Sequence, residues 1–231
     1  MSKVATGARK DRESGFTIIE LLIATAVFSM VLVIVTMGFM SLSNAYFKST
    51  VTAATQSTTR DIADTLGKAI QFSGPLPQFG TKDLPSGVKL YQICANNRKF
   101  FFVPNVVYLG GEATEENPGL YVQPYSNTCD AEILDKNKGT QLLGENMSIA
   151  NLDISYFSNL TYTIKLRVMY GQQDMFCSAT PSRFAVACDG SPGSNAIFGR
   201  MIDSLRCKTD DNYFCAVATS ETTVKKRMTG N

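Results

Sequence analysis

One acidic residue, Glu20, stands at the start of a long apolar run and has the clearest chemical role in the sequence. From Leu21 to Met40 the chain has no Asp, Glu, Lys, Arg or Pro, and a run of about 20 such residues is long enough to span a membrane as a helix. A carboxylate in lipid costs several kcal/mol unless a partner neutralises it. We therefore expect Glu20 to function through a neutralising partner.

Catalytic and metal-binding patterns are poorly represented. The sequence contains no histidine, so Ser-His-Asp and Cys-His arrangements are excluded, and a Ser-Lys or two-carboxylate site stays open without a pattern that singles one out. No Cys-x-x-Cys motif occurs. The segment Asp135–Gly139 has an incomplete spacing for a calcium loop and is better read as a turn. We predict no enzymatic activity, no metal and no cofactor.

The first fifteen residues read as a processing segment rather than as structure. Residues 1–15 hold four basic and two acidic side chains, which predicts a leader that stays on the cytoplasmic side while the rest of the chain lies outside. The whole chain has a formal net charge of +2, so the part after residue 15 is nearly neutral and does not favour nucleic-acid binding. An ordinary secretory signal fits less well, because Glu20 interrupts the run and the run is long.

The apolar run predicts the first half of a long helix. Residues 16–40 would form the membrane-spanning half, and residues 41–73 an amphipathic half with a stripe that packs on a head domain. Ser73-Gly74-Pro75 ends the pattern. The expected helix therefore runs from about Phe16 to Phe72. Its stripe comprises Phe47, Val51, Ala54, Ile62, Leu66 and Ile70.

Residues 74–231 predict a globular head built from β-strands. A loop is expected over residues 74–86, followed by strands over 88–94, 99–109 and 119–125. Two alternating runs, Leu152–Tyr156 and Tyr162–Tyr170, predict an antiparallel hairpin with one face on the helix. A final pair of strands is expected over 214–218 and 222–227. The fold class is thus α+β, with a long N-terminal helix and an antiparallel sheet.

Cysteine usage indicates an oxidising compartment. All six cysteines follow the apolar run, and none lies in the leader or the helix: Cys94, Cys129, Cys177, Cys188, Cys207 and Cys215. Six cysteines allow 15 pairings, which the sequence alone does not resolve. Proximity favours Cys94 with Cys129, Cys177 with Cys188, and Cys207 with Cys215. We expect disulfides that staple the head.

The residues Gly15-Phe16-Thr17-x-x-Glu20, after a basic leader and before an uncharged helix, resemble the class III signal of type IV pilins and type II secretion pseudopilins. The resemblance implies that a prepilin peptidase cuts between Gly15 and Phe16 and methylates the new amino terminus of Phe16. It also implies that Glu20 meets the terminal amine of a neighbouring subunit. The filament core would then be packed by the run that includes Thr17, Ile18, Ile19, Leu21 and Leu22.

The same resemblance implies a non-enzymatic subunit that is stored in the cytoplasmic membrane as a single-pass protein and later reaches the pilus at the cell surface. Its partners would be membrane lipid before assembly, prepilin peptidase, other major and minor pilins, and the inner-membrane platform of the pilus or secretion machine. The order of the hairpin and the basic end Lys225-Lys226-Arg227 is similar to that of minor pilins and J-type pseudopilins. A minor pilin is the favoured reading.

Two alternatives stay open. A pseudopilin of a type II secretion or competence machine would share the architecture, and a signal-anchored adhesin or binding module would share only the anchor. The basic run at residues 225–227 is a small candidate surface for DNA, but three charges at a strand end are more often solvated, and no aromatic side chains alternate with them. DNA binding is therefore not favoured.

Overall fold

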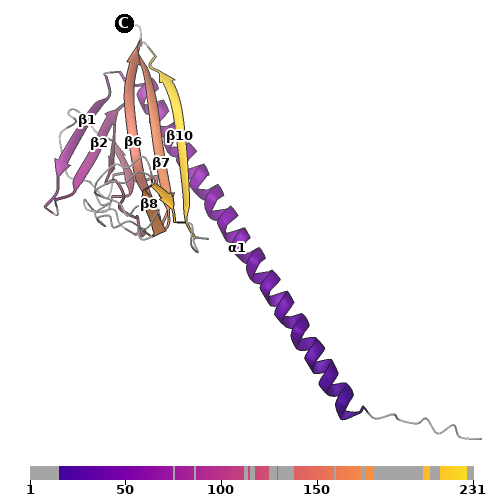
Figure 1. The fold of residues 1–231 in the computed structure, drawn as a ribbon. Coiled ribbons are helices and arrows are strands. Elements are labelled where there is room, and N and C mark those ends of the chain that lie inside the picture. Colours follow the sequence, from indigo (N-terminus) through magenta and orange to yellow (C-terminus); the bar gives the residue numbers. More distant parts are fainter. Residues whose placement is uncertain are drawn as a thin grey trace, which may run out of the picture. The chain divides into compact units, whose positions relative to one another are not determined.

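The computed structural model describes residues 16–74, 76–85, 87–111, 114, 118–124, 129, 138–158, 160–172, 175–178, 205–208 and 214–227. Contacts divide the chain into two compact units, Met1–Asn44 and Ala45–Asn231. The first unit contains the N-terminal part of one long helix, and the second contains the rest of that helix with all of the strands (Figure 1). The α+β class and the single long N-terminal helix are confirmed.

Helix α1 spans Ile18–Gln71, close to the limits that the sequence predicts. Between Leu21 and Met40 it is built from residues with no helix breaker apart from Gly38. The helix ends where Ser73 and Gly74 follow, and its last turn contains Lys68, whose positive charge suits the negative end of the helix dipole.

In the second unit, α1 buries one face against the strands. Ile62, Leu66 and Ile70 of the predicted stripe are fully buried, but Ala54 is exposed and Phe47 is 45 % exposed. Two threonines occupy the buried face instead. Thr55 and Thr59 are almost completely buried. Their hydroxyls donate to the carbonyls of Val51 and Thr55 at 2.7 and 2.6 Å, so burial leaves no hydroxyl unsatisfied.

A five-stranded antiparallel sheet has the order β1-β2-β3-β4-β5. Its strands are β1 (Gln78–Asp83), β2 (Lys89–Ala95), β3 (Arg98–Phe102), β4 (Leu120–Pro124) and β5 (Thr140–Gln141). The loop expected over residues 74–86 is wrong in part, because β1 forms there and pairs with β2 from Gln78 to Asp83. The strand expected over 99–109 stops at Phe102, since Pro104 and the left-handed Asn105 turn the chain.

A three-stranded sheet has the order β10-β7-β6, and its strands are β6 (Met147–Ser158), β7 (Thr161–Tyr170) and β10 (Ala216–Lys225). The predicted hairpin is present as β6 and β7. The final pair of strands is wrong: residues 216–225 form one strand that pairs with β7 along its whole length. A third, two-stranded sheet joins β8 (Phe176–Ser178) to β9 (Leu205–Cys207).

A bulge interrupts β6 at Ala150. Ile149 pairs with Val168 and Asn151 pairs with Arg167, so Ala150 has no partner across the sheet. Because of this extra residue, the positions that face the main core change from odd-numbered residues before the bulge to even-numbered residues after it. Ile149 and Leu152 both face the main core, whereas Ala150 joins a second cluster with Met169, Phe176, Leu205 and Cys215.

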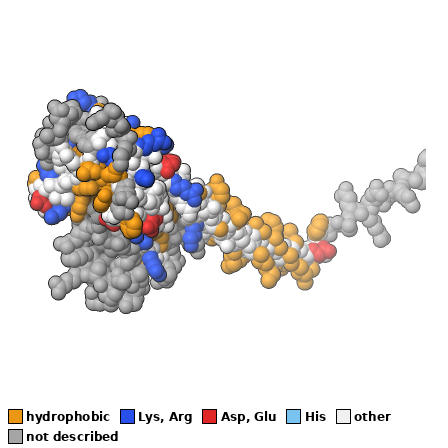
Figure 2. Space-filling view, turned by 90° about the horizontal axis from the view of Figure 1, so that it is seen from above, with side chains coloured by type: hydrophobic (Ala, Val, Ile, Leu, Met, Phe, Trp, Pro, Cys, Tyr) orange, Lys and Arg blue, Asp and Glu red, His pale blue; other side chains and the backbone are white. Residues whose placement is uncertain are grey.

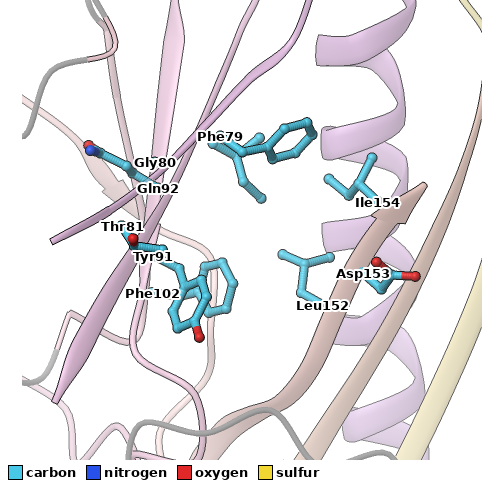
Figure 3. A pocket seen from close by; sticks show the side chains of 10 residues that line it. Phe79, Gly80, Thr81, Tyr91, Gln92, Phe102, Leu152, Asp153 and Ile154 are labelled. Carbon is cyan, nitrogen blue, oxygen red and sulfur yellow. The ribbon is translucent and has the colours of Figure 1, made fainter. Parts of the chain in front are cut away.

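The main core lies between α1 and the two larger sheets. It joins Leu66 and Ile70 of α1 to Phe100 of β3 and to Ile164 and Leu166 of β7. On one side the sheets diverge and leave a groove of about 350 Å³. Phe79 and Tyr91 reach into this groove opposite Leu152 and Ile154 of β6 (Figure 3).

Disulfides lie in the second unit. Cys94 bonds to Cys129 and Cys207 bonds to Cys215, which are two of the pairs that sequence proximity favours. Cys177 is also disulfide-bonded. Its favoured partner, Cys188, lies outside the described residues. The first bridge ties strand β2 to the segment after β4, and the second ties β9 to the residue before β10.

Candidate functional site

The first turn of α1 holds Glu20 through reciprocal hydrogen bonds with Thr17. The Thr17 backbone amide donates to Glu20 Oε2 at 3.0 Å, and the Thr17 hydroxyl donates to the same oxygen at 2.8 Å. The Glu20 amide in turn donates to Thr17 Oγ1 at 3.4 Å. This is a capping box, in which the residue before the helix and the third helical residue satisfy each other's free amides.

The capping box leaves one carboxylate oxygen open. Both Thr17 donors contact Oε2, and no described residue donates to Oε1 of Glu20. The positive end of the helix dipole also favours a carboxylate at this position. The site is thus prepared for one further donor, and no cation of the described residues contacts the carboxylate.

Phe16, the residue that would carry a new amino terminus, precedes the capping box and is 87 % exposed. Its neighbour in the expected cleavage site, Gly15, lies outside the described residues. Cleavage between the two would leave the Thr17 amide in a peptide bond, so the capping box does not depend on the leader. The amine and the carboxylate would then lie within the same short segment of the chain.

The apolar run exposes its side chains on every face. Ile18, Ile19, Leu21 and Leu22 are 61 to 81 % exposed, and Figure 2 shows hydrophobic side chains along the described N-terminal part of α1. Within the chain this helix is long and apolar enough to cross a membrane, and none of its most apolar stretch is buried. An apolar surface of this extent needs lipid or other helices around it.

The hydroxyls in this run do not break its apolar character. Thr25, Ser29 and Thr36 donate to the carbonyls of Leu22, Thr25 and Leu32 at 3.0, 2.7 and 2.7 Å. Each hydroxyl is satisfied inside the helix, as lipid requires. Glu20 is the one Asp, Glu, Lys or Arg side chain between Ile18 and Phe47.

Residues 10–36 match the family model described as the prokaryotic N-terminal methylation motif. The chain carries a class III prepilin signal. This signal is consistent with the type IV pilin and pseudopilin family, and it marks the chain as a pilin-like substrate of prepilin peptidase. No curated protein and no solved structure matches the chain. With the apolar α1, the signal supports a membrane-anchored protein.

Sequence reasoning assigned Thr17 to the filament core and did not identify its bond to Glu20. The sequence does contain a pattern that predicts this bond, because Thr-x-x-Glu immediately before an apolar helix is the capping-box pattern. Within the prepilin signal, the expected cleavage and pairing roles direct attention to Phe16 and Glu20 and not to Thr17. The structure adds Thr17 as the residue that orients the Glu20 carboxylate.

Two residues of the basic run at the end of β10 donate hydrogen bonds to carbonyls at the C-terminal end of α1. The Lys226 ammonium donates to the Gly74 carbonyl at 2.9 Å, and the Arg227 amide donates to the Gln71 carbonyl at 2.9 Å. The Arg227 guanidinium also lies over the Phe72 ring, 5.0 Å from its centre. Two of the three cations thus bind free carbonyls or an aromatic face at the end of α1, which gives them a structural role.

Proposed function

We propose that the protein is a minor type IV pilin, a structural subunit that is processed between Gly15 and Phe16 and methylated on Phe16. It is stored as a single-pass protein in the cytoplasmic membrane, with the amino terminus cytoplasmic and the head outside. From there it enters a pilus or primes its growth. The observation that carries the proposal is the open Oε1 of Glu20 at the start of an exposed, otherwise uncharged helix within a prepilin signal.

The partner of Glu20 in this proposal is the terminal amine of Phe16 in a neighbouring subunit. A carboxylate next to lipid requires a cation, and the next charged residue along the chain is Lys48. The amine of another chain would reach the open oxygen without breaking the capping box. Ile18, Ile19, Leu21 and Leu22 would then pack against the helices of neighbouring subunits through dispersion contacts.

We favour a minor pilin because the β6–β7 hairpin followed by the basic run at residues 225–227 resembles the order found in minor pilins. The described residues of the head form three sheets and carry disulfides, an elaborate head that fits this assignment. The alternative within the same architecture is a pseudopilin of a secretion or competence machine, which would share the Glu20 site. An anchored adhesin without a filament would have no use for the open carboxylate oxygen.

The first experiment determines the amino terminus of the protein from its native membrane by mass spectrometry, with and without prepilin peptidase. The proposal requires a mature chain that begins at N-methylated Phe16 only when the peptidase is present. An intact leader under both conditions, or cleavage after Met40, would contradict it. Quantifying the protein against the major subunit in sheared filaments then separates a minor pilin from a subunit confined to the membrane.

A further inference from the structure

Three exposed aromatic rings gather where the second unit begins. Tyr46 and Phe47 of α1 are 68 and 45 % exposed, and Phe214, just before β10, is 50 % exposed. The Phe47 ring centre lies 6.3 Å from that of Tyr46 and 5.8 Å from that of Phe214. We name these three residues the aromatic cluster. They join two segments that are far apart in the sequence.

The core does not account for the aromatic cluster. Among the described residues, none of the three belongs to a buried cluster, and the buried face of α1 begins at Thr55. The residue that follows Phe214, Cys215, is 3 % exposed and bonded to Cys207. The Phe214 backbone is thus anchored while its ring stays outside. A fixed group of rings with one apolar side open needs an apolar or interfacial surface against it.

The chain places this cluster next to the membrane span. Tyr46 follows Met40, the last residue of the run, by six positions, and six helical steps cover about 9 Å. The headgroup layer on each side of a bilayer is about 5–8 Å thick, given a core of about 30 Å within about 40–45 Å in total, so Tyr46 lies at the outer edge of this layer. Lys48, the first cation after the run, follows at once and is exposed.

We infer that the aromatic cluster is an interfacial anchor, which seats the head on the outer headgroup layer of the membrane before assembly. Aromatic side chains are enriched at this depth, because a ring is apolar and a Tyr hydroxyl is polar. Lys48 would contact anionic headgroups from the same segment. The inference rests on the membrane-stored state of the proposed function and adds a second membrane contact to the spanning helix.

The sequence offers a clean optical test, because the chain contains no tryptophan. The full-length, disulfide-intact F214W variant is reconstituted in phosphatidylcholine and phosphatidylglycerol vesicles that contain lipids brominated at either a shallow or a deep carbon. F47W provides a second reporter in the cluster, should F214W perturb the local packing. Phe28 lies near the middle of the run and is 63 % exposed, so F28W reports the bilayer centre.

The matched control within the head is F157W. Phe157 is 80 % exposed, and it is the next-to-last residue of β6, beside the β6–β7 turn. Phe214 precedes the first residue of β10, which pairs with Tyr170, whereas the last residue of β10 pairs with Thr161 beside that turn. The ten residues of β10 separate the two ends by about 30 Å. An aromatic ring at the turn should therefore stay in water.

The inference predicts that shallow bromines quench F214W and F47W at least about twofold more than deep ones, that deep bromines quench F28W, and that F157W is quenched by neither. It is overturned if F214W and F47W are unquenched by lipid while F28W is quenched, or if quenching of F214W is strongest with deep bromines. A change in F214W emission that follows protein density in the bilayer would assign the cluster to another subunit and overturn it too. If F28W is unquenched, the chain does not span the membrane, and the inference falls with its premise.

Discussion

Gly67 of α1 and Val224 of β10 lie so close together that a Cβ on Gly67 would be 3.2 Å from Val224 Cγ2. The helix therefore approaches β10 at a point without a side chain. This contact joins the sheet to the buried face of α1, because Val224 packs against the main core.

Enlarging Gly67 should force α1 and β10 apart. We expect Gly67→Leu to lower the free energy of unfolding of the head by about 1–3 kcal/mol, as overpacking does. Gly67→Ala should be nearly neutral, because the gain of up to about 1 kcal/mol in helix propensity offsets the close contact. Denaturant unfolding of the oxidised protein measures both. Val224→Ala should restore part of the loss in Gly67→Leu, and an absence of such rescue would show that the strain lies elsewhere.

Glu20→Gln should leave processing and membrane insertion intact but reduce incorporation into filaments. The amide keeps the size of the side chain and removes the charge that the proposed amine partner needs. A loss of at least about tenfold, or about 1.4 kcal/mol per contact, is expected in sheared filaments. Ile19→Leu, a nearby apolar exchange, serves as the control. Wild-type incorporation of Glu20→Gln would contradict the pairing role.

Thr17→Val should weaken the first turn of α1 by about 1 kcal/mol, because it removes the hydroxyl from the capping box and keeps the shape of the side chain. Amide exchange at Glu20 and Leu21 should become about fivefold faster in lipid nanodiscs. Thr17→Ser retains the hydroxyl and should behave as wild type. Equal exchange rates in Thr17→Val and Thr17→Ser would mean that the hydroxyl does not orient Glu20.

The two described disulfides should differ in their contribution to stability. Cys94 and Cys129 are separated by 35 residues, and Cys207 and Cys215 by 8. By loop entropy the longer bridge contributes about 4 kcal/mol and the shorter about 2.5 kcal/mol. Paired replacement by alanine and denaturant unfolding measure each one. The reverse order would indicate that the second buried cluster, which contains Cys215, depends on the Cys207–Cys215 bridge for its packing.

The head should lose stability in alkaline solution. Burial raises the pKa of Tyr162, and the neighbouring Tyr156, whose ring centre is 5.4 Å away, raises that pKa further. A raised pKa in the folded state stabilises the fold fully below the unfolded value of about 10, and this contribution is lost as the pH rises through the folded value. Tyr162→Phe should remove this part of the pH dependence. Tyr46→Phe, at an exposed ring, should retain it.

The apolar half of α1 and the prepilin signal could be predicted because each depends on local sequence. Charge-free length defines the run, and Gly15, Phe16 and Glu20 define the signal. The hairpin of β6 and β7 was equally clear, since Tyr162, Ile164, Leu166 and Val168 alternate without interruption and are all buried. In these segments the local pattern and the tertiary environment agree.

The errors arose where tertiary contacts decide the structure. Strand β1 contains Gly80, where a Cβ would lie 2.7 Å from the Gln92 side-chain nitrogen, so its glycine reflects close packing on β2 and not a loop. Residues 219–221 of β10 look like a turn in the sequence, but pairing with β7 keeps them extended. Thr55 and Thr59 look polar, yet bonds to their own helix allow burial.

The bulge at Ala150 also bears on how β6 can change over evolutionary time. Deleting one residue from a regular strand turns every later side chain to the opposite face. In β6 the deletion of Ala150 would instead produce an unbroken alternation, in which Met147, Ile149, Leu152 and Ile154 all keep their present face. The strand could thus shorten by one residue without turning its core-facing side chains outward, and only the second buried cluster, which contains Ala150, would lose a side chain.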